Sequence, residues 1–353
     1  MRVFVCCGHL LLFGFVKRWE TEFCAVLVVA LAATAACRSP DEPACRPEKP
    51  AAEPAAAGRN EAPKSEPDAG AGEAVAALVD RLTGSAVIGA RPISKRSLSI
   101  KVALASGDRA VFKPLRRTNR TARYEVAFSK VAKLVGADGV PVSALRRVPL
   151  AQLAGLLEVS YPESAKALRD EALADGAGLV GGAIIEWIAE LGPSRFEGET
   201  GWKQLAGWLA ADGPSAGDEP TIAAVSRMVV ADYVAGNWDR FSGGNLFADA
   251  SGRGLWLVDN NGAFGRWSDK QRARMDGQLA ACGRFSASQI ARLRTLTAGD
   301  VRAALADEEA RGIVEHLLTD EEVGLVLERR DAVLRKVDAE VAARGEAAVM
   351  AFP

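Results

Sequence analysis

Three oxygen-bearing side chains stand close together in the sequence among several glycines. Asp239 and Asn245 lie in "GNWDRFSGGNL", and Asp259 ends the apolar run of "GLWLVDNNGAF". The runs "NLFAD" and "LWLVD", joined by the Gly- and Ser-containing "ASGRG", predict a β-hairpin. Asn245 opens its first strand and Asp259 closes its second, so antiparallel pairing brings both to one end. Asp239, on the loop that enters the hairpin, should lie near the same end.

Carboxylate and amide oxygens without His or Cys suit a hard cation that keeps some of its waters, Mg²⁺ rather than Zn²⁺. The alternative is a polar turn, because Asp, Asn and Gly are common in turns for backbone reasons alone. This stretch by itself leaves both interpretations open.

Composition narrows the classes of function. The chain has 353 residues, 49% hydrophobic and 25% charged, which is a globular composition with room for one large domain or two lobes. A formal net charge of −1 argues against nucleic-acid binding. The only histidines are His9, in a predicted targeting segment, and His316. Histidine-dependent catalysis therefore rests on His316 alone, and carboxylate and lysine chemistry is favoured instead.

The N-terminus has the features of an export signal. Lys17 and Arg18 precede the apolar "CAVLVVALAATAAC", which predicts a signal peptide over residues 1–36. Cys37 follows "ATAA" and resembles the lipidated cysteine of a bacterial lipobox. Thr34 stands where that motif usually has Leu, so cleavage without lipid is the alternative. We expect an extracytoplasmic protein, lipid-anchored to a bacterial membrane and contacting the membrane only through that lipid.

Residues 37–72 are rich in Pro, Ala and Glu and contain hardly any large apolar residue, which predicts a disordered tether. From residue 73 onward the patterns are those of a folded domain. Helical spacing of apolar residues predicts helices over 73–84, 121–136 and 221–236. Alternating or continuous apolar runs predict a hairpin over 97–115 and extended segments over 140–150 and 181–191. Thr319 and Glu322 form a capping-box signature for a last long helix.

Four motifs occur in an order that resembles a known family. They are "AVFKPLRRTNRTARYEVAFSKVAKLVGADGVP", "IIEWI", "GNWDRFSGGNLF" and "LWLVDNNGAFG". Together they resemble the secretory-pathway kinases of the four-jointed and Golgi casein kinase family and, more distantly, HipA-type and phosphatidylinositol kinases. The resemblance covers about residues 85–267. It implies an α+β, two-lobed atypical protein-kinase-like fold over 73–353, with a small β-rich N-lobe with one helix (about 73–185) and a mostly helical C-lobe (about 186–353).

The same resemblance implies a nucleotide site. Lys113 would hold the α- and β-phosphates of ATP, and Glu125 would pair with it. The alternatives are an ordinary surface lysine and a solvated helix glutamate. Backbone groups from Glu186 to Ile188 would bind adenine. Ser94 and Lys95, in "RPISKRSL" before the first predicted strand, would cover the phosphates, unless that segment is merely a polar loop.

For the reaction itself, the resemblance implies that Asp239 receives or orients the proton of the acceptor hydroxyl. Asn245 and Asp259 would hold Mg²⁺ or Mn²⁺. One departure is that Asn245 lies six residues after Asp239, where related loops generally have five. We expect Gly243 and Gly244 to absorb the additional residue.

These residues predict an exported kinase that transfers the γ-phosphate of ATP to a hydroxyl of a protein Ser/Thr or a glycan. ATP is scarce outside the bacterial cytoplasm. The alternative interpretation is therefore a pseudokinase that binds nucleotide or acts as a scaffold without catalysis. A structural lipoprotein whose Asp-Gly motifs are turns is the third interpretation.

Overall fold

The computed structural model of the protein describes residues 69–94, 98–210 and 219–353. The predicted signal peptide, Cys37, nearly all of the predicted tether and Lys95 therefore lie outside the described residues. The described residues belong to one compact unit.

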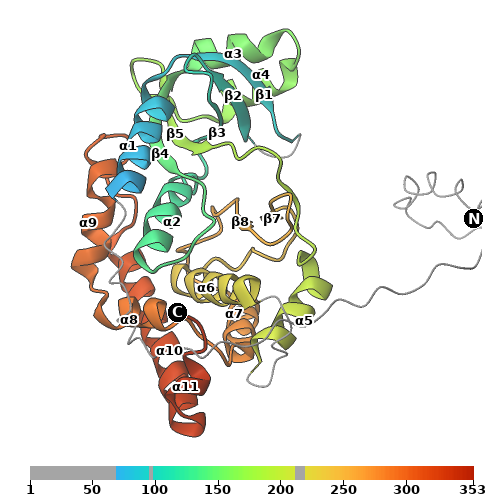
Figure 1. The fold of residues 1–353 in the computed structure, drawn as a ribbon. Coiled ribbons are helices and arrows are strands. Elements are labelled where there is room, and N and C mark those ends of the chain that lie inside the picture. The colour runs from blue at the N-terminus through green and yellow to red at the C-terminus, as the bar shows by residue number, and fades with distance from the viewer. Residues whose placement is uncertain (1–68, 95–97, 211–218) are drawn as a thin grey trace, which may run out of the picture. The chain divides into compact units, whose positions relative to one another are not determined.

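The first lobe is built around a five-stranded antiparallel sheet, in the order β1-β2-β3-β5-β4 (Figure 1). Its strands are β1 (Val87–Pro92), β2 (Ile100–Leu104), β3 (Arg109–Pro114), β4 (Ser143–Pro149) and β5 (Leu179–Glu186). In β2, Ile100, Val102 and Leu104 are buried and the two residues between them are half-buried, as the period of a strand with one covered face requires. The hairpin predicted over 97–115 is confirmed as β2 and β3.

Four helices surround this sheet: α1 (Ala69–Gly84), α2 (Arg123–Leu134), α3 (Leu150–Glu158) and α4 (Pro162–Glu171). The helix α2 packs against β4 and β5 and buries Glu125, Val126 and Phe128. The expectation of one helix in this lobe was wrong, because α3 and α4 pair with each other and α3 covers β1. The strand β1 was also missed, so "RPISKRSL" joins β1 to β2 and does not enter the first strand.

The second lobe is mostly helical and begins after β5 ends at Glu186. Its elements are β6 (Gly192–Pro193), α5 (Gly198–Leu209), α6 (Glu219–Ala235), β7 (Leu246–Ala248), β8 (Leu255–Leu257), α7 (Asp269–Ala281), α8 (Ala287–Thr295), α9 (Ala298–Glu309), α10 (Asp320–Arg344) and α11 (Glu346–Val349). The helix α6 is buried on almost every face, which suits its nearly continuous apolar sequence. It packs against α5, α7 and α10 at the centre of this lobe.

Two local predictions in this lobe are confirmed. The strands β7 and β8 form the expected hairpin, with Leu246 opposite Leu257 and Ala248 opposite Leu255. Thr319 caps α10 through a capping box with Glu322. No helix among the described residues is both long enough and apolar enough to span a bilayer.

Candidate active site

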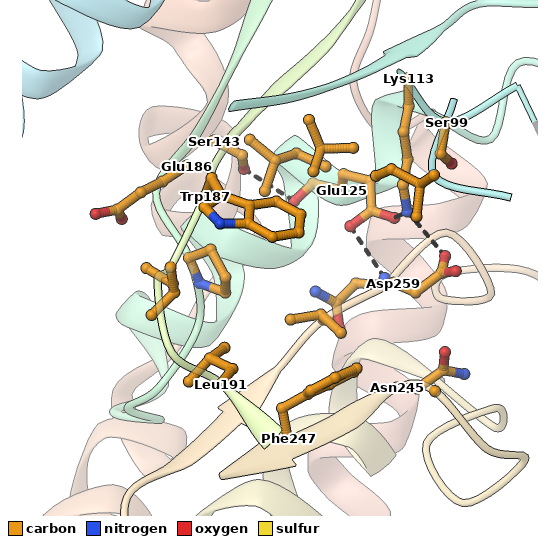
Figure 2. Close-up of a pocket in the computed structure, with 18 of the residues that line it drawn as sticks. Ser99, Lys113, Glu125, Ser143, Glu186, Trp187, Leu191, Asn245, Phe247 and Asp259 are labelled. Carbon is orange, nitrogen blue, oxygen red and sulfur yellow. Dashed lines mark hydrogen bonds and ion pairs between the residues drawn. The ribbon is translucent and has the colours of Figure 1, made fainter. Parts of the chain in front are cut away.

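A cavity of about 440 Å³ lies where the sheet of the first lobe faces the β7–β8 hairpin (Figure 2). The first lobe contributes side chains of β3, α2 and β5, and the second lobe contributes the glycine loop before β7 and the residues after β8. The lining residues that concern the chemistry are Ser94, Lys113, Glu125, Glu186, Ile188, Asn245 and Asp259. All the residues predicted for nucleotide and metal binding that the structure describes therefore share one cavity.

Lys113, near the end of β3, joins the two lobes at this cavity. Its Nζ donates to Glu125 Oε1 at 2.6 Å and to Asp259 Oδ1 at 2.9 Å. Burial alone would lower the pKa of Lys113, but the carboxylates of Glu125 and Asp259 outweigh it and raise the pKa above its ordinary value. The ammonium is thus held charged and aimed by two carboxylates, one from each lobe.

Glu125 is itself fixed from the second lobe. Its side chain is 3% exposed, and its Oε2 accepts a hydrogen bond from the backbone N–H of Asn260 at 3.0 Å. The pairing of Lys113 with Glu125 that the resemblance implies is present. The direct contact of Lys113 with Asp259 was not predicted, since 146 residues separate the two.

Asp259 follows β8 in a conformation that residues with a side chain seldom adopt. Its φ is +53°, in the left-handed region, which costs about 1–2 kcal/mol for a residue other than Gly. The neighbouring residue Val258 donates its N–H to the carbonyl of Asn245 at 3.1 Å. Strand pairing thus brings Asn245 and Asp259 to one end of the hairpin, and the turn at Asp259 directs its carboxylate to Lys113.

The loop from Asp239 to Asn245 accommodates the unusual spacing. Gly243 and Gly244 have φ values of +98° and +82°, which favour glycine and let the chain take up one more residue. The Asn245 Nδ2 donates to the Asp239 carbonyl at 2.8 Å and to Asp239 Oδ2 at 3.2 Å. Asp239 is not among the lining residues and meets the cavity through Asn245.

The donor set at this end of the hairpin fits a hard cation. Figure 2 shows the amide oxygen of Asn245 on the side of Asp259, away from the nitrogen that binds Asp239. The Asp259 side chain is 45% exposed, and the buried Asn245 lines the same cavity, so a carboxylate and an amide oxygen lie together there. Among the described residues no group of three His, Cys, Asp or Glu side chains could hold a metal. A cation here would need phosphate or water oxygens to complete its shell, as Mg²⁺ commonly does.

A buried arginine that the sequence analysis did not single out organises the loop. Arg240 donates from Nε and Nη2 to the two oxygens of Asp232, both at 2.9 Å. Its Nη1 donates to the carbonyls of Asn245 and Val258, and its Nη2 also donates to Asn260 Oδ1 at 2.6 Å. Asp232 lies in the apolar run of α6, and a lone acid in such a run was the available signal for a buried partner.

A second residue outside the predictions holds the glycine loop from the other side. The half-buried Glu197 accepts three backbone N–H bonds through Oε1, from Gly244 at 2.8 Å and from Asn245 and Leu246 at 3.0 Å. One carboxylate oxygen therefore fixes the segment that carries Asn245.

The segment predicted to bind adenine also uses its side chains. Glu186 donates its N–H to the Val142 carbonyl at 2.8 Å, and its Oε2 accepts from the Val142 N–H at 3.3 Å. The indole of Trp187 projects among the lining side chains, and the Nζ of Lys101 lies 3.1 Å from its ring centre. Burial, followed by the charges of Arg91 and Arg109, lowers the pKa of Lys101. The side chains of Glu186 and Trp187 therefore take part in the contacts of this segment beside its backbone groups.

Solved structures share this fold. The crystal structure of the Golgi casein kinase with Mn/ADP bound matches with a TM-score of 0.58 and 14% identity, covering 79% of each chain, and a second structure of that kinase matches equally. The structure of hydra Fam20 with sugar matches with a TM-score of 0.56 and 14% identity, covering 78% of this chain and 91% of the other. The chain thus has the two-lobed α+β kinase-like fold of these proteins. The predicted fold class is confirmed, and the resemblance to the Golgi casein kinase family is confirmed at the level of the fold.

The similarity lies in the structure. No protein-family model matches the chain, and no curated protein sequence matches it significantly.

The Glu197 contacts lead to a stability prediction. Replacing Glu197 by Ala removes the acceptor of three backbone donors and should lower the free energy of unfolding by about 2 kcal/mol. The matched control is Glu199→Ala, since Glu199 is 82% exposed and pairs only with Lys203 on the next turn. Urea unfolding of both variants beside the wild type measures the difference. Equal midpoints for Glu197→Ala and Glu199→Ala would show that the loop does not depend on Glu197.

Proposed function

We propose that the protein is an ATP-dependent kinase that transfers the γ-phosphate to a hydroxyl of a protein Ser/Thr or a glycan. The observation that carries the proposal is the buried Lys113, held between Glu125 and Asp259 in a cavity between the lobes. Transfer of a phosphoryl group asks a protein mainly for positioning and for neutralisation of charge. A fixed ammonium beside two metal-binding oxygens supplies both.

The position of each residue indicates its proposed role. Lys113 would bind the α- and β-phosphates, with Glu125 holding its Nζ in place. Asn245 Oδ1 and the Asp259 carboxylate would bind Mg²⁺ or Mn²⁺, which supplies charge neutralisation at the β- and γ-phosphates. Asp239, oriented by its bonds from Asn245, would accept or orient the proton of the acceptor hydroxyl. Residues 186–188 and the Trp187 ring would enclose the base.

Two observations support ATP and a divalent metal as the cofactors. The accessible donors at the end of the hairpin are oxygens, which suit Mg²⁺ and Mn²⁺. A Golgi casein kinase of the same fold was solved with Mn/ADP bound. The alternative is a pseudokinase that binds the same nucleotide without transferring phosphate.

The first experiment tests whether Lys113 is at a nucleotide site. Mg²⁺ with ATP should raise the melting temperature of the wild type, because ligand binding to the native state stabilises it. The shift should shrink in Lys113→Ala, measured against that variant's own baseline, which also falls because buried Glu125 loses its partner.

The matched control is Lys130→Ala, which removes a lysine of the same helix as Glu125 from another buried glutamate, Glu308, at 3.2 Å. Lys130 does not line the cavity, so its variant should keep the full ATP shift. An equal shift in both variants would remove Lys113 from the nucleotide site.

The second experiment separates a kinase from a pseudokinase. Asp259→Ala should weaken Mg²⁺-dependent nucleotide binding together with turnover. Asp239→Asn should leave nucleotide binding nearly intact and lower turnover by about 10² to 10⁴, since it removes the charge that receives the proton. ATP consumption and phosphate transfer to a mixed protein or glycan extract are the measurements. Wild-type turnover by Asp239→Asn would contradict its role, and tight binding without turnover by the wild type would identify a pseudokinase.

We also propose export, with a lipid on Cys37, on the grounds of the N-terminal sequence alone. A fatty-acid analogue should label the wild-type protein in the membrane fraction, and Cys37→Ser should lose the label. Label that persists in Cys37→Ser would contradict lipidation at this residue. Cytoplasmic protein that retains residues 1–36 would contradict export.

A further inference from the structure

A second cavity, of about 320 Å³, lies between α6, α7 and α10 and shares no lining residue with the cavity at Lys113. Its charged lining consists of four arginines and two acids: Arg266, Arg272, Arg329, Arg335, Asp276 and Glu328. Four guanidinium groups against two carboxylates leave this cavity with an excess of positive charge.

The positive groups are poorly neutralised by the protein. Arg266 pairs with Glu321 at 2.5 Å, and Asp276 accepts a hydrogen bond from the Tyr233 hydroxyl at 2.8 Å. Arg272, Arg329 and Arg335 form no ion pair with any described residue. With Arg266 neutralised by Glu321, the three guanidinium groups of Arg272, Arg329 and Arg335 remain in the lining beside two carboxylates, which leaves a positive excess.

Arg329 is the buried member of this group. It is 4% exposed, donates from Nη2 to the Gly265 carbonyl at 2.6 Å and from Nη1 to the Ala235 carbonyl at 3.4 Å, and stacks on Trp267 with 4.2 Å between its Cζ and the ring centre. Burial lowers the pKa of Arg329 to about 10, although the nearby Glu328 carboxylate opposes this shift. A buried guanidinium whose hydrogen bonds go to carbonyl oxygens and not to a carboxylate is costly, and an anion in the cavity would offset that cost.

We propose that this cavity binds an oxyanion of the phosphate class, either free phosphate or the phosphate group of a small phosphorylated molecule. A guanidinium presents paired N–H donors that match phosphate oxygens, and three guanidinium groups that form no ion pair with the described residues fit that chemistry better than they fit a cation or an apolar ligand. Arg272 and Arg335 are exposed and would meet the ligand first, while Arg329 forms the floor.

Arg329 connects this cavity to the two loops of the candidate active site. The Ala235 carbonyl, which accepts from Arg329, also accepts from the Phe264 N–H at 2.6 Å. Arg329 therefore contacts the carbonyl of Ala235, shortly before Asp239 in the chain, and the carbonyl of Gly265, shortly after Asp259. The inference concerns binding and is independent of the proposed kinase activity.

The test is titration calorimetry of the folded protein with inorganic phosphate, phosphoserine and a hexose phosphate, each against chloride at equal ionic strength. Arg272→Gln/Arg335→Gln should weaken binding about a hundredfold or more, since each lost charge-assisted contact weakens binding about tenfold or more. The control with the same charge change is Arg274→Gln/Arg294→Gln, because both arginines are exposed and neither lines the cavity. The exposed residues Arg272 and Arg335 are replaced because a change at the buried Arg329 would endanger folding.

Tighter binding of one of the three ligands would identify the source of the phosphate group. Lys113→Ala should bind all three as the wild type does, which separates this site from the nucleotide site. Equal affinity in the two double variants, loss of binding in Lys113→Ala, or no binding of any ligand beyond that of chloride would each overturn the proposal.

Discussion

The site depends on a single buried guanidinium. Arg240 is 1% exposed and uses all five of its N–H donors, on both oxygens of Asp232, on the carbonyls of Asn245 and Val258, and on the Asn260 side chain. These partners come from α6, from the residues just before β7 and just after β8, and from the turn that follows. A lysine has three donors and no planar fork, so it could not hold the same four segments together.

This network holds a strained turn in place. Asp259 adopts a left-handed φ of +53°, and Asn260, directly after it, is fixed by bonds to Glu125, to Arg240 and from its Nδ2 to the Leu257 carbonyl at 3.1 Å. Such strain persists where the surroundings determine the conformation, which is common at functional sites. The result is that the Asp259 carboxylate lies against Lys113 while its side chain stays 45% exposed.

The features that could be predicted from the sequence are those determined by residues close together in the chain. The β7–β8 hairpin follows from two apolar runs and a short turn, and the Thr319 capping box from four consecutive residues. The roles of Gly243 and Gly244 follow from the freedom of glycine. Contacts such as Lys113 with Asp259 and Glu197 with the glycine loop were missed, because nothing in the spacing of distant residues shows which side chains meet. The helices α3 and α4 were missed although Pro162 stands at a first helical position, a usual start signal.

The last helices complete both lobes, and this has a consequence for biosynthesis. Glu308 of α9 accepts from the Leu145 N–H of β4 at 2.8 Å, Glu322 of α10 binds Arg123 of α2 at 2.7 Å, and Arg329 supports the carbonyls on either side of the active-site loops. A nascent chain that has reached residue 300 already carries every residue of the candidate active site but none of these supports. About thirty more residues must therefore be synthesised before the site can become rigid. A protein truncated in α9 or α10 would contain every residue of the candidate site but lack the contacts that hold them in place.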